Sequence, residues 1–292
     1  MSASAMFGHL FLEYFSRRSS ERIPESHLVM EASDQVDSFM ASGHDDGILV
    51  PIHFYHALQA SAVIKPGERV VELACGPANQ LIRMAQLNPE TQFVGLDASE
   101  SMLDVARNSI AKYAIRNVEL VAGDMAELTG FKNTSFDGVV CTMSLHHLPS
   151  LAALANTFSE VQRVLKPGGG LYICDFGRLK RKSTQLFFAN DRSTEQSPQF
   201  TADYLESLAA AFSVAEMRDA TSRLDLELLL YETVLVPFMV VIKSPDRRVL
   251  ESAMERRAVE MYGGLSSTQQ RDFHNIARWF RLAGYGLPFE LD

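Results

Sequence analysis

The sequence has little of what marks secreted, membrane-spanning or metal-thiolate proteins. It contains three cysteines, Cys75, Cys141 and Cys174, with neither C-x-x-C spacing nor paired histidines nearby, so we expect reduced, buried thiols. No apolar run approaches the roughly 18 residues that a membrane span needs. The stretch from Met1 to Arg17 lacks the apolar core and cleavage site of a signal peptide. We therefore expect a cytoplasmic protein with no membrane partner.

Positive charge is also scarce. The chain has 27 Lys and Arg against 36 Asp and Glu, a formal net charge of −9, which disfavours a nucleic-acid partner because such binding needs a basic surface. One local basic segment, "GRLKRK" at residues 177–182, leaves two interpretations open: a site for an anionic substrate or a solvated charged loop. No internal repeat or low-complexity segment is present.

What the sequence does have is an alternation of short apolar runs with helix-length periodic stretches from residue 68 onward. This pattern is typical of strands joined by crossover helices in a parallel sheet. The predicted strands are Arg69 to Leu73, Gln92 to Leu96, Val118 to Val121, Gly138 to Thr142 and Gly170 to Cys174. The "KPGGG" at residues 166–170 is expected to end the helix before the last of these strands.

The order changes after the fifth strand. Residues 201–212 look helical, residues 213–218 could form a strand, and "LVPFMVVIK" at residues 235–243 is a strong apolar strand. We predict that these two strands form an antiparallel hairpin at one sheet edge, since antiparallel neighbours need no crossover helix. The predicted fold is an α/β, Rossmann-like doubly wound sheet. Helical regions at residues 1–64 and 244–292 flank a domain at 65–243, and their apolar faces permit a homodimer or burial against that domain.

Three strand ends carry the signals of a nucleotide site. In an open parallel sheet, ligands bind at the carboxyl ends of the strands where the strand order reverses. The first strand leads into "ELACGPA", whose small residues allow close backbone approach and whose Pro77 suits the first turn of a helix. Asp97 ends the second strand, where it can accept both hydroxyls of a ribose. Asp124 follows the third strand and can accept from an adenine amino group.

At this point the chain resembles a known family. The stretches "VVELACGPA", "VGLDAS", "AGDMAEL", "FDGVVCTMSLHHLP" and "LKPGGGLYICDF" are similar, in order, to the motifs of class I S-adenosylmethionine-dependent methyltransferases. The similarity is greatest to the metal-independent small-molecule branch that includes ubiquinone-biosynthesis-type enzymes. One departure is that Ala74 and Ala78 stand where the family usually has glycine, so we expect a loop that uses positive φ less freely.

The resemblance implies a methyltransferase with S-adenosylmethionine as cofactor, a small-molecule substrate and no metal. The residues it implies at the cofactor are Glu72, Ala74, Cys75, Gly76, Asp97, Ala98, Met102, Gly123, Asp124, Met125 and Met143. For Met102 and Met143, packing in the core is the competing interpretation. The candidate catalytic residues are His146 and His147, placed after the fourth strand, because histidine titrates near neutrality and can accept a proton from a substrate.

Other functions stay open on sequence grounds. His53 and His56 in the N-terminal helical region are further candidate bases, and an RNA or protein substrate would keep the same chemistry. A dinucleotide-dependent oxidoreductase is the alternative from another class, but it calls for G-x-G-x-x-G where this chain has A-x-G-x-A. A non-catalytic cofactor-binding protein is a further alternative.

Overall fold

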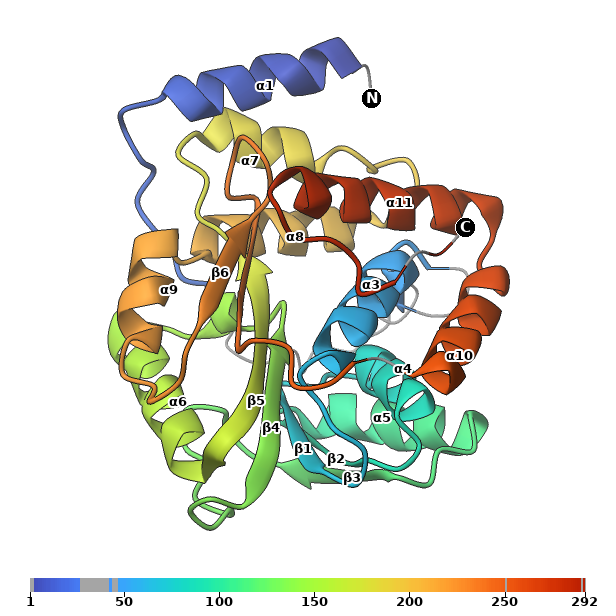
Figure 1. Ribbon diagram of the computed structural model, residues 1–292. Helices are drawn as coiled ribbons and strands as arrows, with labels where there is room; N and C mark the ends of the chain where they lie inside the picture. The colour runs from blue at the N-terminus through green and yellow to red at the C-terminus, as the bar shows by residue number, and fades with distance from the viewer. Residues whose placement is uncertain (1–2, 27–41, 44–46, 250, 290, 292) are drawn as a thin grey trace.

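A seven-stranded mixed sheet organises the protein, as the computed structural model shows for residues 3–26, 42–43, 47–249, 251–289 and 291 (Figure 1). The strand order is β3-β2-β1-β4-β5-β7-β6. Strands β1 to β5 pair in parallel, whereas β7 is antiparallel to β5 and β6 is antiparallel to β7. The order reverses between β1 and β4, so the carboxyl ends of these two strands mark the place where a ligand is expected.

Helices cover both faces of this sheet. The strand bounds are β1 Arg69–Leu73, β2 Gln92–Asp97, β3 Val118–Ala122, β4 Phe136–Thr142, β5 Leu165–Phe176, β6 Leu229–Glu232 and β7 Met239–Lys243. The helices between β1 and β6 are α4 Asn79–Leu87, α5 Glu100–Lys112, the short 3₁₀ helix η1 Leu145–His147, α6 Leu151–Val164, α7 Lys182–Ala189, α8 Pro198–Ala210 and α9 Val214–Thr221. Consecutive strand residues point to opposite faces, so Val70 and Val140 join one core whereas Val71 and Val139 join the other.

The five parallel strands confirm the predicted sheet, but two details of the edge were wrong. Residues 213–218 form the start of helix α9 rather than a strand, because Ser213 caps that helix in a capping box with Glu216. The hairpin pairs β7 with β6, which precedes it directly. Helix α6 ends at Val164, just before "KPGGG", and that segment already belongs to β5.

The terminal regions are helical where the structure describes them. Helices α1 (Ala3–Phe15) and α3 (Val50–Ser61) precede the sheet, and α10 (Ser252–Gly263) and α11 (Ser267–Leu282) follow it. Helix α3 packs against α4 and α11, so both terminal regions share one hydrophobic core with the sheet. Within the helical region expected at residues 1–64, residues 27–41 and 44–46 lie outside the described residues. Among the helices that are described, none has the length and apolarity to cross a membrane.

Candidate active site

The loop after β1 runs through three residues with left-handed backbone. Ala74 has φ 53°, Gly76 has φ 52° and Ala78 has φ 64°. The expectation that the two alanines would use positive φ less freely was therefore wrong. A left-handed alanine costs about 1–2 kcal/mol, and tertiary packing holds it: Ala78 is fully buried at the start of α4, and the Cys75 N–H donates to the Leu96 carbonyl at 2.9 Å. The strained loop brings backbone, rather than side chains, to the ends of β1 and β2.

Glu72 stands beneath this loop as a buried, half-partnered carboxylate. It is 2% exposed, and its Oε1 accepts from Gln80 Nε2 at 3.0 Å, whereas Oε2 has no partner among the residues that the structure describes. Burial, together with the charge of Asp97, raises the pKa of Glu72 well above its usual range. A buried carboxylate oxygen without a donor is costly, so this site is built to receive a cationic or hydrogen-bond-donating group.

Asp97 connects the loop to the end of β2. Its Oδ2 accepts from the Gly76 N–H at 2.7 Å and its Oδ1 accepts from the Ser99 N–H at 2.9 Å. Burial raises the pKa of Asp97, although these backbone donors oppose the shift. Each oxygen keeps a lone pair for a further donor, such as a ribose hydroxyl. The neighbouring Ala98 is exposed, and Met102 is buried in the first turn of α5.

The other residues predicted to contact the cofactor differ from one another in burial and in hydrogen bonding. Asp124 is exposed after β3, and its Oδ1 accepts from the Ala126 N–H at 2.8 Å in a local turn. Met125 is buried, and Gly123, the residue before Asp124, is part-exposed. Met143 has φ 53° after β4, and its N–H donates to the Cys174 carbonyl at 2.8 Å. Burial raises the pKa of the Cys75 thiol well above its usual range. Because the thiolate is the reactive form, we expect Cys75 to be chemically inert at this position.

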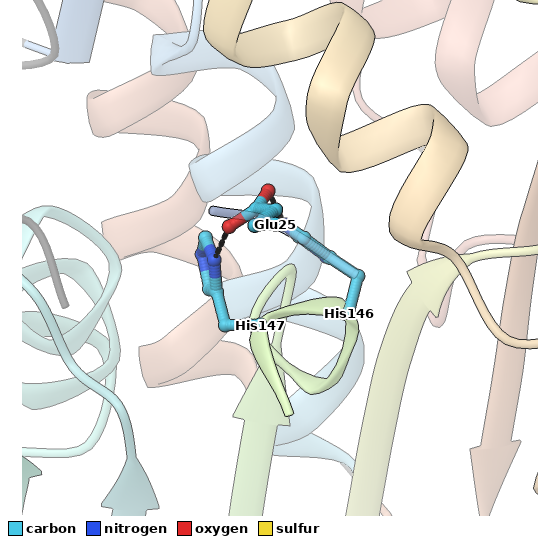
Figure 2. A group of neighbouring side chains, drawn as sticks. All are labelled: Glu25, His146 and His147. Atoms are coloured by element: carbon cyan, nitrogen blue, oxygen red, sulfur yellow. Dashed lines mark hydrogen bonds and ion pairs between the residues drawn. The ribbon is translucent and has the colours of Figure 1, made fainter. Parts of the chain in front are cut away.

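Both predicted histidines lie in η1, but their environments differ. His146 is 3% exposed; its ring Nδ1 is 2.6 Å from Asp175 Oδ1, and its backbone N–H donates to Asp175 Oδ2 at 3.0 Å. His147 is part-exposed, and its Nδ1 bonds to Glu25 Oε2 (Figure 2). The side chain of His147 is therefore the more accessible of the two.

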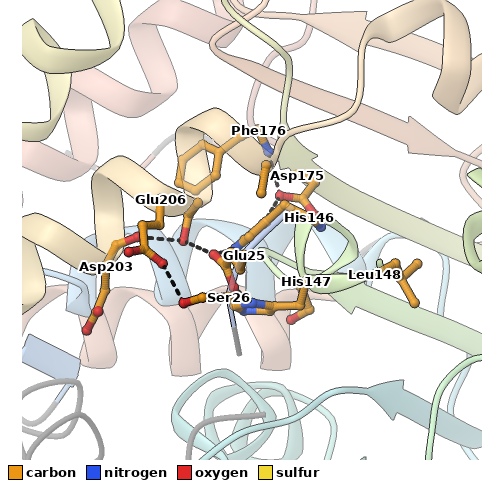
Figure 3. A network of polar contacts seen from close by, with 12 residues as sticks. Glu25, Ser26, His146, His147, Leu148, Asp175, Phe176, Asp203 and Glu206 are labelled. Carbon is orange, nitrogen blue, oxygen red and sulfur yellow. Dashed lines mark hydrogen bonds and ion pairs between the residues drawn. The ribbon is translucent and has the colours of Figure 1, made fainter. Parts of the chain in front are cut away.

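The carboxylates around the histidines set their charge. Burial disfavours a charged His146 ring, but Asp175 and the more distant Glu25 outweigh this effect and raise its pKa. Burial would likewise raise the pKa of Glu25, but the hydrogen bond and charge of His147 lower it overall. Ser207 Oγ donates to Glu25 Oε1 at 2.8 Å, so helix α8 also belongs to this network. Figure 3 shows Asp203 and Glu206 of the same helix beside Glu25.

Glu25 reaches the site because the segment at residues 18–26 is fixed across the loop that follows β4. The Arg22 guanidinium donates to the backbone carbonyls of His146 and Leu148, and to that of Pro149 at 3.1 Å. It also donates to the Ala210 carbonyl at 2.6 Å and lies 3.9 Å over the Phe212 ring. The Ile23 N–H donates to the Ala209 carbonyl at 3.0 Å.

Sequence reasoning missed Glu25, Arg22 and Asp175. Asp175 carried a recognisable signal, an acid at the carboxyl end of a buried strand in "ICDF". Glu25 and Arg22 had none, because nothing near them in the chain indicates that they meet residues more than 120 positions away. In the basic "GRLKRK" segment, Arg178 forms an ion pair with Glu216 at 2.9 Å. The backbone N–H groups of Lys180 and Arg181 donate to the Glu13 carboxylate. His56 is fully buried, with its Nδ1 2.8 Å from the Tyr172 hydroxyl.

The fold and a family match define a class I methyltransferase. Residues 64–221, more than half of the chain, match the model of a family described as "Methyltransferase domain". The chain belongs to this methyltransferase-domain family. The methyltransferase class predicted from the five sequence motifs is thereby confirmed.

Characterised relatives cover only part of the chain. A demethylmenaquinone methyltransferase of Listeria monocytogenes serotype 4a is 38% identical over 113 residues, which is 38% of this chain and 46% of the relative. A demethylmenaquinone methyltransferase of Symbiobacterium thermophilum is 29% identical over 164 residues, 56% of this chain and 59% of the relative. The chain thus spans about half the length of the curated relatives it matches.

Solved structures support the fold. A protein from Pyrococcus horikoshii superposes with a TM-score of 0.56 at 20% identity, covering 74% of this chain and 100% of its own. A SAM-dependent methyltransferase from Aquifex aeolicus superposes with a TM-score of 0.53 at 15% identity, covering 72% of this chain and 96% of its own. At these identities the likeness concerns the Rossmann-like architecture, which agrees with the predicted fold class.

Proposed function

We propose that this protein transfers the methyl group of S-adenosylmethionine to a small organic molecule by in-line displacement. The observation that carries the proposal is the buried Glu72 carboxylate at the carboxyl end of β1, whose Oε2 accepts from no donor in the described part of the chain. The ammonium group of the methionine part would supply that donor. Asp97 would accept from the ribose hydroxyls, and the small residues of the 74–78 loop leave room for the cofactor. Asp124 and Met125 would contact the adenine ring.

The bound cofactor supplies an electrophilic methyl group on a sulfonium, and the chain's own residues place an acceptor against it. Positioning of two reactants contributes about 7–11 kcal/mol in favourable cases, more than the roughly 3–5 kcal/mol of general acid–base catalysis. We assign His146 and His147 to the acceptor side, where they lower the cost of removing its proton. His147, being part-exposed, is the more accessible of the two to an acceptor.

Aromatic side chains beside the histidines favour a flat, apolar acceptor. The Phe176 ring lies 5.3 Å from the His146 ring and 5.5 Å from that of Tyr204. The relatives named demethylmenaquinone methyltransferase would act on a molecule of this shape. The acidic balance of the chain also favours a small molecule over RNA. The three-part division at residues 64/65 and 243/244, the cytoplasmic location and a homodimer are further proposals from the sequence.

Isothermal titration of the purified protein with S-adenosylmethionine, S-adenosylhomocysteine and NAD tests the cofactor. We expect both sulfur nucleosides to bind and NAD not to bind. Asp97→Ala should weaken S-adenosylhomocysteine by about 100-fold, since two hydrogen bonds to a charged acceptor contribute about 1.5 kcal/mol or more each. Asp104→Ala, which removes an exposed acid on α5, is the matched control and should bind normally. Binding of NAD alone would refute the proposal.

A second experiment tests the acceptor class. Methyl-labelled cofactor is incubated with the protein and with separate small-molecule, RNA and protein fractions of a cell extract. Label is expected in the small-molecule fraction. Label in RNA or protein would contradict the proposed substrate class, and binding of both nucleosides without any methyl incorporation would indicate a non-catalytic role.

A further inference from the structure

We propose that Glu25, His146 and His147 form a binding site for a divalent transition-metal ion of the Zn²⁺ type. The ligand atoms that these three side chains offer all lie within 4.8 Å of one another (Figure 2). They come from two parts of the chain, the segment at residues 18–26 and η1, which Arg22 joins. This proposal goes beyond the metal-free reaction that the sequence resemblance implies, and its catalytic part rests on the proposed function.

The orientation of His146 is the first argument. Asp175 is fully buried and bonds to His146 Nδ1 at 2.6 Å, which leaves Nε2 as the free ring nitrogen. That Nε2 faces Glu25 Oε1 at 3.9 Å. A carboxylate that fixes one ring nitrogen while the other faces a ligand position is the usual support of metal-binding histidines. Ser207 orients the Glu25 carboxylate, because its hydroxyl donates to Oε1 at 2.8 Å.

The chemistry and geometry of the donors are the second argument. Two imidazoles and one carboxylate suit zinc and neighbouring transition metals, whereas Mg²⁺ and Ca²⁺ prefer oxygen ligands throughout. In a tetrahedral zinc site with bonds of about 2.0–2.1 Å, ligand atoms lie about 3.3 Å apart. From separations within 4.8 Å, side-chain adjustments of about 1.5 Å reach that geometry. Three protein ligands leave one position for water or substrate.

The charge around the site is the third argument. Glu25 and Asp175 carry two negative charges and the Arg22 guanidinium one positive charge, so with neutral histidines the net charge is −1. The hydrogen bonds of Arg22 go to backbone carbonyls, so its contacts leave the carboxylate oxygens of Glu25 to other partners. A divalent ion changes the net charge to +1, which an anionic oxygen on the acceptor would neutralise. A metal ion lowers the pKa of an oxygen bound to it, so an acceptor hydroxyl would release its proton to solvent.

Metal titration of the full chain, first treated with a chelator, tests the site. We expect one equivalent of Zn²⁺ to bind per chain by calorimetry, and Co²⁺ to give visible absorption bands that added Zn²⁺ removes. His147→Ala and Glu25→Gln should each weaken Zn²⁺ binding at least 100-fold. Asp175→Asn, which alters the support of His146 but none of the three ligands, should weaken it about 10- to 100-fold.

His274→Asn is the matched control, since it removes an exposed histidine on α11 outside the cluster. It should bind Zn²⁺ like the unaltered protein. Absence of Zn²⁺ and Co²⁺ binding in the unaltered protein, or equal binding in His147→Ala, would overturn the proposal. S-adenosylhomocysteine binding by each variant shows that it is folded. It also separates the two proposals, because failure of nucleoside binding alone refutes the proposed function and leaves the metal result standing.

Discussion

The two halves of the site are built in different ways. The half proposed to hold the cofactor, here called the cofactor half, consists of a strained backbone loop and of acids at the carboxyl ends of β1 and β2. The acceptor half, after β4 and β5, includes contacts of Glu25, Arg22 and Ser207 that span 122 to 188 positions of sequence. The comparison teaches that local sequence specifies the proposed cofactor half, whereas tertiary packing specifies what stands opposite it.

Loss of the buried carboxylate of Asp175 should give the largest effect and should be confined to the acceptor half. Asp175→Ala leaves the ring Nδ1 and backbone N–H of His146 without their acceptors, and breaking a buried pair costs about 3–5 kcal/mol. Urea unfolding measures this loss in the free energy of unfolding. At temperatures where the variant is folded, its affinity for S-adenosylhomocysteine should be unchanged; a loss of more than tenfold would show that the two halves are coupled.

Arg22 tests how the N-terminal segment is attached. Arg22→Ala removes four hydrogen bonds to backbone carbonyls and the stacking on Phe212, which we expect to lower the free energy of unfolding by about 2 kcal/mol. Arg22→Lys should recover little, because an ammonium cannot reproduce the guanidinium fork.

Amide exchange locates the effect of losing Arg22. Exchange should speed up in residues 18–26 and 145–149 and stay unchanged at β1 and β2. Arg107→Ala, which removes an exposed ion pair on α5, is the control and should leave the unfolding midpoint where it is. Unaltered exchange at 145–149 in Arg22→Ala would mean that other contacts hold the segment.

Replacing Glu72 in the cofactor half should raise the stability of the free protein and lower its affinity for the nucleoside. Because its folded pKa is raised, the ionised carboxylate destabilises the ligand-free protein as pH rises above about 4.5, whereas the protonated form does not. Glu72→Gln should therefore stabilise the free protein by about 1 kcal/mol at pH 8 and by less at pH 5. It should also weaken S-adenosylhomocysteine at least tenfold.

Urea unfolding at the two pH values and calorimetric titration with the nucleoside measure these quantities. A substitution that lowers stability equally at pH 5 and pH 8 would contradict the assignment of Glu72 as an unsatisfied buried carboxylate.

The smallest effect should come from the strained loop. Ala74→Gly relieves a left-handed conformation, but it also makes the unfolded chain more flexible, so we expect a net stabilisation of a few tenths of a kcal/mol. Ala114→Gly is the matched control, since Ala114 is exposed and has φ 52° after α5. Thermal unfolding should report similar gains for both variants. Only Ala74→Gly should change nucleoside affinity, by a few-fold, because only that residue shapes the loop.

Particular residues show why the sequence predicted one half better than the other. Asp97 follows a predicted strand directly, so its place at the sheet edge could be inferred, and the structure puts it against Gly76. The positive φ of Ala74 and Ala78 could not be inferred, because the packing that imposes it depends on the whole core. The misassigned strand at residues 213–218 arose because the capping box of Ser213 and Glu216 outweighed a short apolar pattern. Glu25 could not be found, since it meets His147 only in the folded chain.

The attachment of Arg22 also fixes when the site can form during synthesis. The guanidinium contacts carbonyls of residues 146–149 and 210, so these contacts require at least 210 residues to have left the ribosome. The loop between β1 and α4 needs far less of the chain. On a growing chain, the loop between β1 and α4 can therefore take shape first, and Arg22 must remain without these contacts until the segment that holds it is made.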